Sequence, residues 1–318
     1  MKFYVGIHQP ADAKRLGRVF VSVNRLTGAK HRKSKFTTEP WIMDSGAFTT
    51  IAKHGGYPEP VSVYADHICR WAAPNLRAAV AQDYMCEPVM LARTGFAVVD
   101  HQRLTIERYD ELMSKWTEGV TIMPVLQGYA PADYAAHVHA YGSRLAFGAW
   151  VGVGSVCKRN GDPGAVLGVL DAVHGVRPDL RLHGFGLKLT SLKDARIRNR
   201  LASADSMAWS YHARRNGGGQ NDWRNALAMA NRIDALEDSL AAVNDVNDHA
   251  ENQTELEDRP AELVEVGRPR DLALDQRGAG LRLTKDSNPP RTTTESPCPK
   301  GSTRVPERAR GNLGRIPR

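Results

Sequence analysis

Residues 41–48 have the sequence WIMDSGAF, a short apolar run that ends in a carboxylate and small residues. The run at 41–43 has the length and composition of a buried β-strand, and Asp44 stands where that strand ends. Similar runs return along the first two thirds of the chain, and amphipathic stretches separate most of the later ones. Strands and helices that alternate in this way indicate an α/β fold with a parallel sheet.

Eight apolar runs are expected to be strands: 3–7, 19–23, 41–43, 78–82, 121–126, 146–151, 181–185 and 202–205. Amphipathic stretches near 59–73, 103–118, 131–141, 163–177 and 190–201 are expected to be helices. Eight βα units predict a (β/α)8 TIM-like barrel. A doubly wound open sheet has the same local pattern and stays an alternative, although no GxGxxG follows the first strand.

The barrel is expected to end soon after Trp223, which is the last aromatic residue of the chain. A final amphipathic helix is predicted over 222–240, so we expect one domain at 1–240. Thirteen acidic residues stand against three basic ones in 234–275, and nine basic residues against three acidic ones in 282–318. Residues 241–318 are therefore predicted to form a disordered tail, acidic and then basic.

The composition, the cysteine spacing and the net charge favour some classes of protein and exclude others. The chain has 318 residues, 42% hydrophobic and 25% charged, which is typical of a soluble globular protein, and we expect no membrane association and a cytoplasmic location. Four scattered cysteines form no CxxC pair, so no metal site is predicted. The formal net charge of +8 makes a nucleic acid a candidate partner.

Short polar groups and glycines follow most of the predicted strands. In a parallel barrel these positions meet at one rim, where active sites lie. Each residue also has a structural explanation, because a lone Asp after a strand often caps the next helix and a Gly often serves a tight turn. The joint pattern favours a catalytic site. The residues are Asp44, Asp83, Gln127 with Gly128, Gly152 with Gly154, Gly184 with Gly186, and Asp205 with Ser206.

These segments resemble an enzyme family. Residues 44–48 resemble the DSGGF segment of tRNA-guanine transglycosylases, residues 127–128 their QG turn, and residues 152–154 their glycine-rich base-binding turn. Asp83 with Cys86 is similar to the DxC segment, and Asp205 to the nucleophile-bearing strand end. Over about 1–225 the set is most similar to the DpdA-type 7-deazaguanine DNA transglycosylases of phages and bacteria, which implies the host cytoplasm if the chain is phage-encoded.

The resemblance implies a reaction and a set of roles. Guanine in DNA would be exchanged for a 7-deazaguanine base of the preQ0 type, with Asp205 as nucleophile and Asp44 as general acid and base. No cofactor is implied, and a DNA-opening protein is a possible accessory partner. The base-binding residues implied are Ser45, Gly46, Asp83, Gln127, Gly128, Gly152, Gly154 and Gly186. Phosphate contacts are expected from Lys158, Arg159, Arg214 and Arg215, which are equally well explained as solvated loop charges.

Two departures from the transfer-RNA enzymes favour DNA. No CxCxxC zinc motif follows Cys157, and no second RNA-binding domain is predicted after the barrel. Ala204 replaces an aromatic residue expected before the nucleophile. A tRNA-guanine transglycosylase and a non-catalytic nucleic-acid-binding subunit remain the alternative functions.

Overall fold

The computed structural model describes residues 1–27, 39–115, 119–159, 161–211, 219 and 221–237. The charged tail predicted for 241–318 lies outside the described residues, as do Arg214 and Arg215.

Nine parallel strands form one sheet in the described part of the chain. Their order is β5-β4-β3-β2-β1-β9-β8-β7-β6, so strands that are adjacent in sequence pair, except β5 with β6, and β1 pairs with β9. The strands are β1 (Lys2–Gly6), β2 (Val19–Ser22), β3 (Trp41–Asp44), β4 (Leu76–Val80), β5 (Thr121–Met123), β6 (Val125–Leu126), β7 (Trp150–Val153), β8 (Arg181–Gly184) and β9 (Leu201–Ser206).

The two ends of the sheet are halves of one predicted strand. Pro124 separates β5 from β6, because proline has no N–H to donate to the ladder. On one side Met123 accepts a hydrogen bond from the N–H of Ala81, and on the other Pro124 accepts one from the N–H of Gly152. The result is a nearly closed parallel barrel, consistent with the TIM-like barrel that the sequence predicts.

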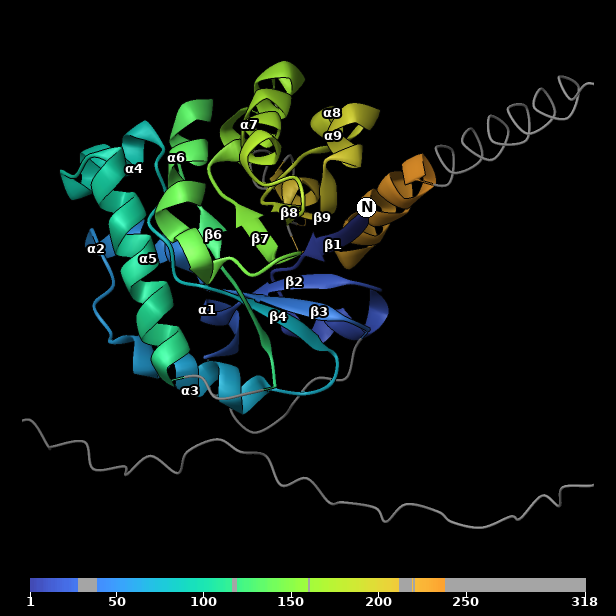
Figure 1. Ribbon diagram of the computed structural model, residues 1–318. Helices are drawn as coiled ribbons and strands as arrows, with labels where there is room; N and C mark the ends of the chain where they lie inside the picture. Colours follow the sequence, from blue (N-terminus) through green and yellow to red (C-terminus); the bar gives the residue numbers. More distant parts are fainter. Residues whose placement is uncertain (28–38, 116–118, 160, 212–218, 220, 238–318) are drawn as a thin grey trace, which may run out of the picture. The chain divides into compact units, whose positions relative to one another are not determined.

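Helices surround the strands on the outside (Figure 1). The helices expected near 59–73, 103–118, 131–141 and 163–177 are confirmed, whereas the stretch 190–201 divides into two short helices. Asp194 causes the division, since its side chain accepts a hydrogen bond from the N–H of Arg196 and caps the second helix. The α-helices are α1 (Val23–Leu26), α2 (Ala47–His54), α3 (Val61–Trp71), α4 (Pro88–Thr94), α5 (Val98–Lys115), α6 (Pro131–Tyr141), α7 (Pro163–Val176), α8 (Leu189–Leu192) and α9 (Ala195–Asn199).

One strand lies later than its sequence pattern indicates. The run 146–151 predicts a strand, but β7 begins at Trp150 and continues to Val153. The N–H of Ala149 bonds to the carbonyl of Ala146, so the first part of the run forms a turn. The shift moves Gly152 from the loop into the strand.

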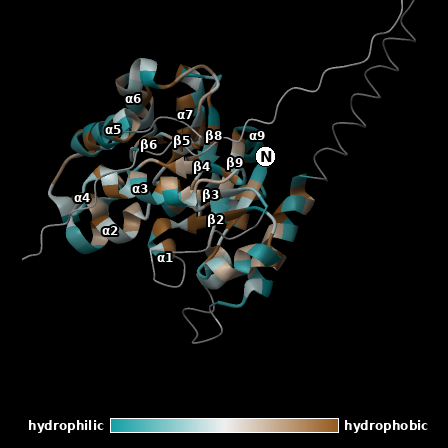
Figure 2. Ribbon diagram, turned by 90° about the horizontal axis from the view of Figure 1, so that it is seen from below, coloured by the Kyte–Doolittle hydropathy of each residue, from teal (hydrophilic) through white to brown (hydrophobic). Residues whose placement is uncertain are grey.

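Side chains alternate between the inside of the barrel and the helix layer, as the period of two in a strand requires. Inside, Tyr4, Phe20 and Ile42 belong to a small apolar cluster with Met123 and Val125. The outward-facing side chains join a larger core against the helices. Figure 2 shows this distribution, with apolar residues concentrated on the strands. The alternation decides which polar side chains at the strand ends face the barrel axis.

A last helix over 223–237, orange in Figure 1, packs beside β1. Ala226 and Ile233 are fully buried in the main core. Arg18 bonds to Asp234, and Glu237 accepts the N-terminal amino group of Met1 at 2.6 Å. The helix therefore completes the wall of the barrel near the amino ends of its strands.

Candidate active site

A pocket of about 300 Å³ opens at the carboxyl ends of the strands. Its volume is at the small end of the usual range for ligand sites. Six residues predicted from the sequence line it together: Asp44, Asp83, Gln127, Gly154, Gly186 and Asp205.

Asp44 reaches the pocket because it is the last residue of β3. Ile42 faces the barrel interior, so Asp44, two residues later, faces the same way. Burial of the carboxyl group, followed in importance by the negative charge of Asp205, raises its pKa to about 6. Hydrogen bonds from the Ser22 hydroxyl and from the Gly46 and Ser45 N–H groups act in the opposite direction. Asp44 is thus suited to exchange a proton near neutral pH.

Asp205 is held by hydrogen bonds from β8 and the loop that follows it. Its side chain is 8% exposed, and its Oδ1 accepts the N–H of Gly186 at 3.0 Å. The Nε2 atom of His183 lies 3.4 Å from the same oxygen. On its other side the His183 ring bonds to the Ser203 hydroxyl at 2.8 Å. A buried carboxylate fixed by a main-chain donor is oriented for attack on an electrophilic carbon.

Asp83 and Gln127 form a buried polar pair. The Nε2 group of Gln127 donates to Oδ2 of Asp83, and the Oε1 atom of Gln127 accepts the hydroxyl of Ser155 at 2.9 Å. Burial raises the pKa of Asp83. The bond from Gln127 acts in the opposite direction, and the resulting pKa is about 7. The pair presents a carboxylate and an amide side by side, which suits an N–H donor edge and a carbonyl acceptor of one planar base.

Two glycines allow the close packing of this site. A Cβ on Gly154 would lie 2.1 Å from Nε2 of Gln127, so a side chain there would displace the amide. Gly186 has a φ of +65°, in the left-handed region that favours glycine, and its N–H contacts Asp205. Both residues line the pocket, so the main chain itself forms part of the site.

Four other predicted residues do not line this pocket. The buried Ser45 lines an adjoining cavity instead, and its hydroxyl has no hydrogen-bond partner among the described residues. Gly46, at a φ of +73°, starts α2. Gly128 packs against α6, where a Cβ would meet Asp133 at 2.7 Å. Gly152 makes room for the ring of Phe185, which does line the pocket.

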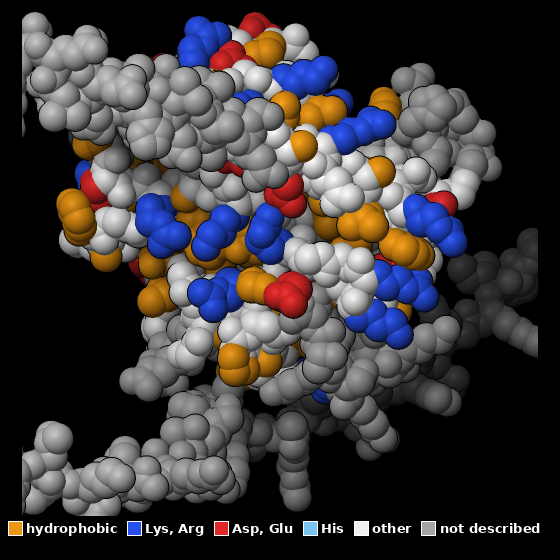
Figure 3. Space-filling view, turned by 90° about the vertical axis from the view of Figure 1, so that its right-hand side faces the viewer, with side chains coloured by type: hydrophobic (Ala, Val, Ile, Leu, Met, Phe, Trp, Pro, Cys, Tyr) orange, Lys and Arg blue, Asp and Glu red, His pale blue; other side chains and the backbone are white. Residues whose placement is uncertain are grey.

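The two predicted basic contacts that the structure describes, Lys158 and Arg159, differ in their surroundings. Lys158 lies with its Nζ 5.4 Å from the ring centre of Phe48, a pocket residue, so its charge is near the opening. Arg159 bonds to the carbonyls of Ser155 and Tyr129 and stabilises the loop after β7. Figure 3 shows Lys and Arg side chains gathered among apolar ones on one face of the molecule.

Several pocket residues were not identified from the sequence. Glu87 is 3% exposed and lines the pocket, although the run 83–88 gave it no role. Phe48 and Phe185 supply apolar wall, and only their positions just after strand ends could have indicated this. His183 was likewise given no role from the sequence, although it lies beside Asp205. Its inward direction follows from the alternation along β8, where Leu182 faces the helices.

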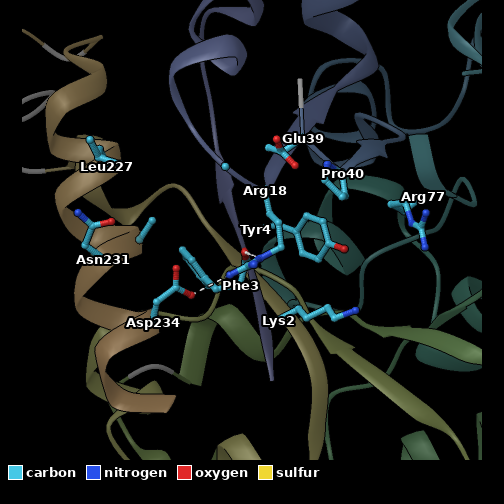
Figure 4. A pocket seen from close by; sticks show the side chains of 12 residues that line it. Lys2, Phe3, Tyr4, Arg18, Glu39, Pro40, Arg77, Leu227, Asn231 and Asp234 are labelled. Atoms are coloured by element: carbon cyan, nitrogen blue, oxygen red, sulfur yellow. Dashed lines mark hydrogen bonds and ion pairs between the residues drawn. The ribbon is translucent and has the colours of Figure 1, made fainter. Parts of the chain in front are cut away.

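A second pocket of about 450 Å³ lies at the opposite end of the barrel. Lys2, Tyr4 and Arg77 line it together with the helix over 223–237 (Figure 4). Arg18 is occupied there by Asp234 and the carbonyl of Phe3. The amino ends of barrel strands usually serve stability, and this pocket contains none of the predicted site residues.

Within the described ranges, no three His, Cys, Asp or Glu side chains form a group that could hold a metal ion. None of the helices in that part of the chain is long and apolar enough to cross a membrane.

The fold and the pocket define a class, that of α/β-barrel proteins with an acidic pocket at the carboxyl ends of their strands. A comparison with curated proteins gives no match. The family model DpdA, described as DeoxyPurine in DNA protein A, matches residues 1–228, more than half of the chain. The chain belongs to the DpdA family. This membership supports an enzymatic role in 7-deazaguanine-related transglycosylation, with DNA as the substrate.

Proposed function

We propose that the protein exchanges guanine in DNA for a 7-deazaguanine base of the preQ0 type through a covalent aspartyl-deoxyribosyl intermediate. The observation that carries this proposal is the placement of Asp205 and Asp44 in one pocket. The first carboxylate is fixed by the N–H of Gly186, and the second has its pKa raised to about 6. Enzymes that break a glycosidic bond usually do so with two carboxyl groups in different environments.

In the first half of the reaction an oxygen of Asp205 bonds to C1′ of the deoxyribose while the bond from C1′ to N9 breaks. The electron pair of that bond leaves with guanine, which takes a proton from Asp44. In the second half the incoming base gives its N9 proton to Asp44, and N9 attacks C1′. The ester bond to Asp205 then breaks, and both carboxyl groups return to their first state.

We assign the recognition of the base to Asp83 and Gln127. The carboxylate of Asp83 would accept the N1–H and the 2-amino group of guanine, and the amide of Gln127 would donate to O6. Apolar contacts from Phe48 and Phe185 would cover the ring, since both line the pocket. A pocket of about 300 Å³ admits a base that has left the helical stack and excludes a base pair.

The test is base exchange by the purified protein. Labelled guanine and 7-cyano-7-deazaguanine would be offered with DNA and, separately, with transfer RNA, followed by nucleoside analysis by mass spectrometry. We expect incorporation into DNA and a covalent protein–DNA species on denaturing gels. Incorporation into transfer RNA alone would contradict the choice of substrate. The absence of exchange with both nucleic acids would favour a non-catalytic subunit.

A further inference from the structure

Exposed aromatic residues lie around the mouth of the pocket at the carboxyl ends of the strands. Phe48, Tyr129 and Tyr211 are 51%, 46% and 50% exposed. Phe48 lines the pocket itself, and Tyr129 comes two residues after the pocket residue Gln127. Tyr211 comes four residues after the pocket residue Met207. The three rings therefore belong to the rim of the pocket, where they are open to a molecule larger than the pocket can hold.

The three rings are spread around the barrel rather than gathered on one side of it. Phe48 follows β3, Tyr211 follows β9 and Tyr129 follows β6. In the order of the strands, two strands separate β3 from β9, and two more separate β9 from β6. Because the ends of barrel strands surround the barrel axis, the rings lie on different sides of the pocket. A polymer that crosses the pocket would meet an aromatic side chain before it and another after it.

Each ring has a positive charge beside it, at a distance typical of a cation–π contact. The distances from the charged group to the ring centre are 5.4 Å for Lys158 on Phe48, 4.8 Å for Arg159 on Tyr129 and 5.5 Å for Lys188 on Tyr211. All three cations come from the loops that follow β7 and β8. The contacts hold the rings in place, while roughly half of each aromatic residue stays open to solvent.

Open aromatic rings beside cations have the chemistry that binds unpaired nucleotides. The face of a base stacks on an aromatic ring, and the phosphate next to that base is attracted by a cation. Bases inside an intact duplex are covered on both faces by their neighbours, so they offer no face to such a ring. Proteins that bind single-stranded nucleic acids combine stacking rings with basic side chains. The rim therefore fits a strand whose bases are unstacked on either side of the pocket.

We propose that the rim binds single-stranded DNA, with Tyr129 and Tyr211 stacking on bases that flank the target base. This inference rests on the proposed function, because it places the target base in the pocket between the two rings. The preferred substrate is then DNA whose strands are already separated around the target. A fully paired duplex binds less well, since its bases must first lose their partners and their stacking before the rings can contact them.

The experiment measures the affinity of the full-length protein for three labelled DNAs by fluorescence anisotropy. They are a single strand, its fully paired duplex, and the same duplex with an unpaired stretch at its centre. We expect the single strand and the partly unpaired duplex to bind more tightly than the paired duplex by about 10-fold or more. Equal or tighter binding of the fully paired duplex would overturn the inference.

Substitutions outside the pocket test the two rings directly. Tyr129→Ala and Tyr211→Ala should each weaken binding of the single strand by about 5- to 150-fold, the range for loss of one stacking ring, and should leave binding of the paired duplex unchanged. Tyr129→Phe and Tyr211→Phe keep the ring and should keep the affinity. Phe147→Ala is the matched control, because this aromatic residue is 91% exposed but precedes β7, at the amino ends of the strands. It should bind all three DNAs as the unaltered protein does.

Binding of DNA does not require base exchange, so the two proposals can fail separately. If the single strand is preferred in a way that depends on Tyr129 and Tyr211 but no base is exchanged, the proposed reaction is wrong and the binding surface stands. If bases are exchanged but the alanine variants bind the single strand as tightly as Phe147→Ala does, the reaction stands and this inference is wrong. Circular dichroism would check folding. Should an alanine variant not fold, the comparison of the three DNAs with the unaltered protein decides.

Discussion

The Nε2 atom of His183 lies 3.4 Å from Oδ1 of Asp205, and this contact ends a buried chain of polar groups inside the barrel. Trp150 donates its Nε1–H to the hydroxyl of Ser203 at 2.8 Å, and that hydroxyl bonds to Nδ1 of His183. Because a carboxylate oxygen only accepts, the hydrogen of the contact with Asp205 is on Nε2, and Nδ1 of a neutral ring then accepts the hydroxyl of Ser203. His183 therefore directs an N–H at the carboxylate of Asp205.

Asp205→Asn should abolish base exchange, because an amide cannot form the covalent bond to C1′. The loss should be roughly 10³-fold or more in kcat, as for other deleted nucleophiles, and no covalent protein–DNA species should form. The fold should persist, since the side-chain volume hardly changes and the carbonyl of the amide can still accept the N–H of Gly186. Rates of exchange and denaturing gels measure both effects.

The matched control is Asp66→Asn, an exposed aspartate on α3, which should keep full activity. Near-normal turnover by Asp205→Asn would refute the assignment of the nucleophile. Ser206 would not replace it readily, because its hydroxyl is already occupied by the N–H of Ala208.

Exchange should depend on pH with a narrow maximum. Asp44 must be protonated to give a proton to the leaving base, so the rate should fall as the pH rises above about 6. Asp83 must be ionised to accept the donors of the base, so the rate should also fall as the pH drops below about 7. We therefore expect a bell-shaped profile of kcat/KM with its maximum between these values.

Asp44→Asn should remove the alkaline side of this profile and lower the rate by roughly 10²- to 10⁴-fold, the range for loss of a general acid. Its remaining activity should rise with pH until Asp83 is fully ionised. An unchanged bell shape in Asp44→Asn would show that another group supplies the proton.

Asp83 should make the protein less stable as the pH rises, whereas an ordinary paired carboxylate makes a protein more stable as the pH rises. Burial raises its pKa from 3.8 to about 7, so between these values the folded protein holds a proton that the unfolded chain releases. The free energy of unfolding therefore falls as the pH rises through this window. Asp83→Asn should make the protein more stable at pH 8 by on the order of 1 kcal/mol, with a smaller difference at pH 4.

Denaturant unfolding of both proteins at the two pH values measures the difference. Asp66→Asn serves again as the exposed control, with no expected change. A loss of stability at pH 8 in Asp83→Asn would mean that the bond from Gln127 outweighs the cost of burying the charge.

The sequence was informative wherever a strand decided the direction of a side chain. Asp44 and Asp205 end apolar runs, so their place at the rim followed from the barrel prediction, and their inward direction follows from alternation with Ile42 and Ser203. The break of one strand at Pro124 changed no site residue.

The places of loop residues were not predicted from the sequence, because they depend on contacts between loops. Glu87 lines the pocket from the loop after β4, and that loop is joined to the loop after β7 by the bond from the N–H of Cys86 to Ser155. Ser155 itself has a φ of +58°, a left-handed conformation that its residue type does not predict. Gly152 and Gly154 looked equivalent in the sequence, yet one makes space for Phe185 and the other for Gln127.

Gly154→Ala should weaken base binding while leaving the barrel intact. The added Cβ would lie 2.1 Å from Nε2 of Gln127, and the flexible end of that side chain would move and lose its bond to Asp83. The KM for the free base should rise by about 10-fold or more, since the amide and the carboxylate would no longer be presented together.

Gly175→Ala is the matched control, because a Cβ there meets nothing within 4 Å and the residue lies in α7. That control should keep a normal KM and gain roughly 0.5–1 kcal/mol in stability. An unchanged KM in Gly154→Ala would show that Gln127 does not contact the base.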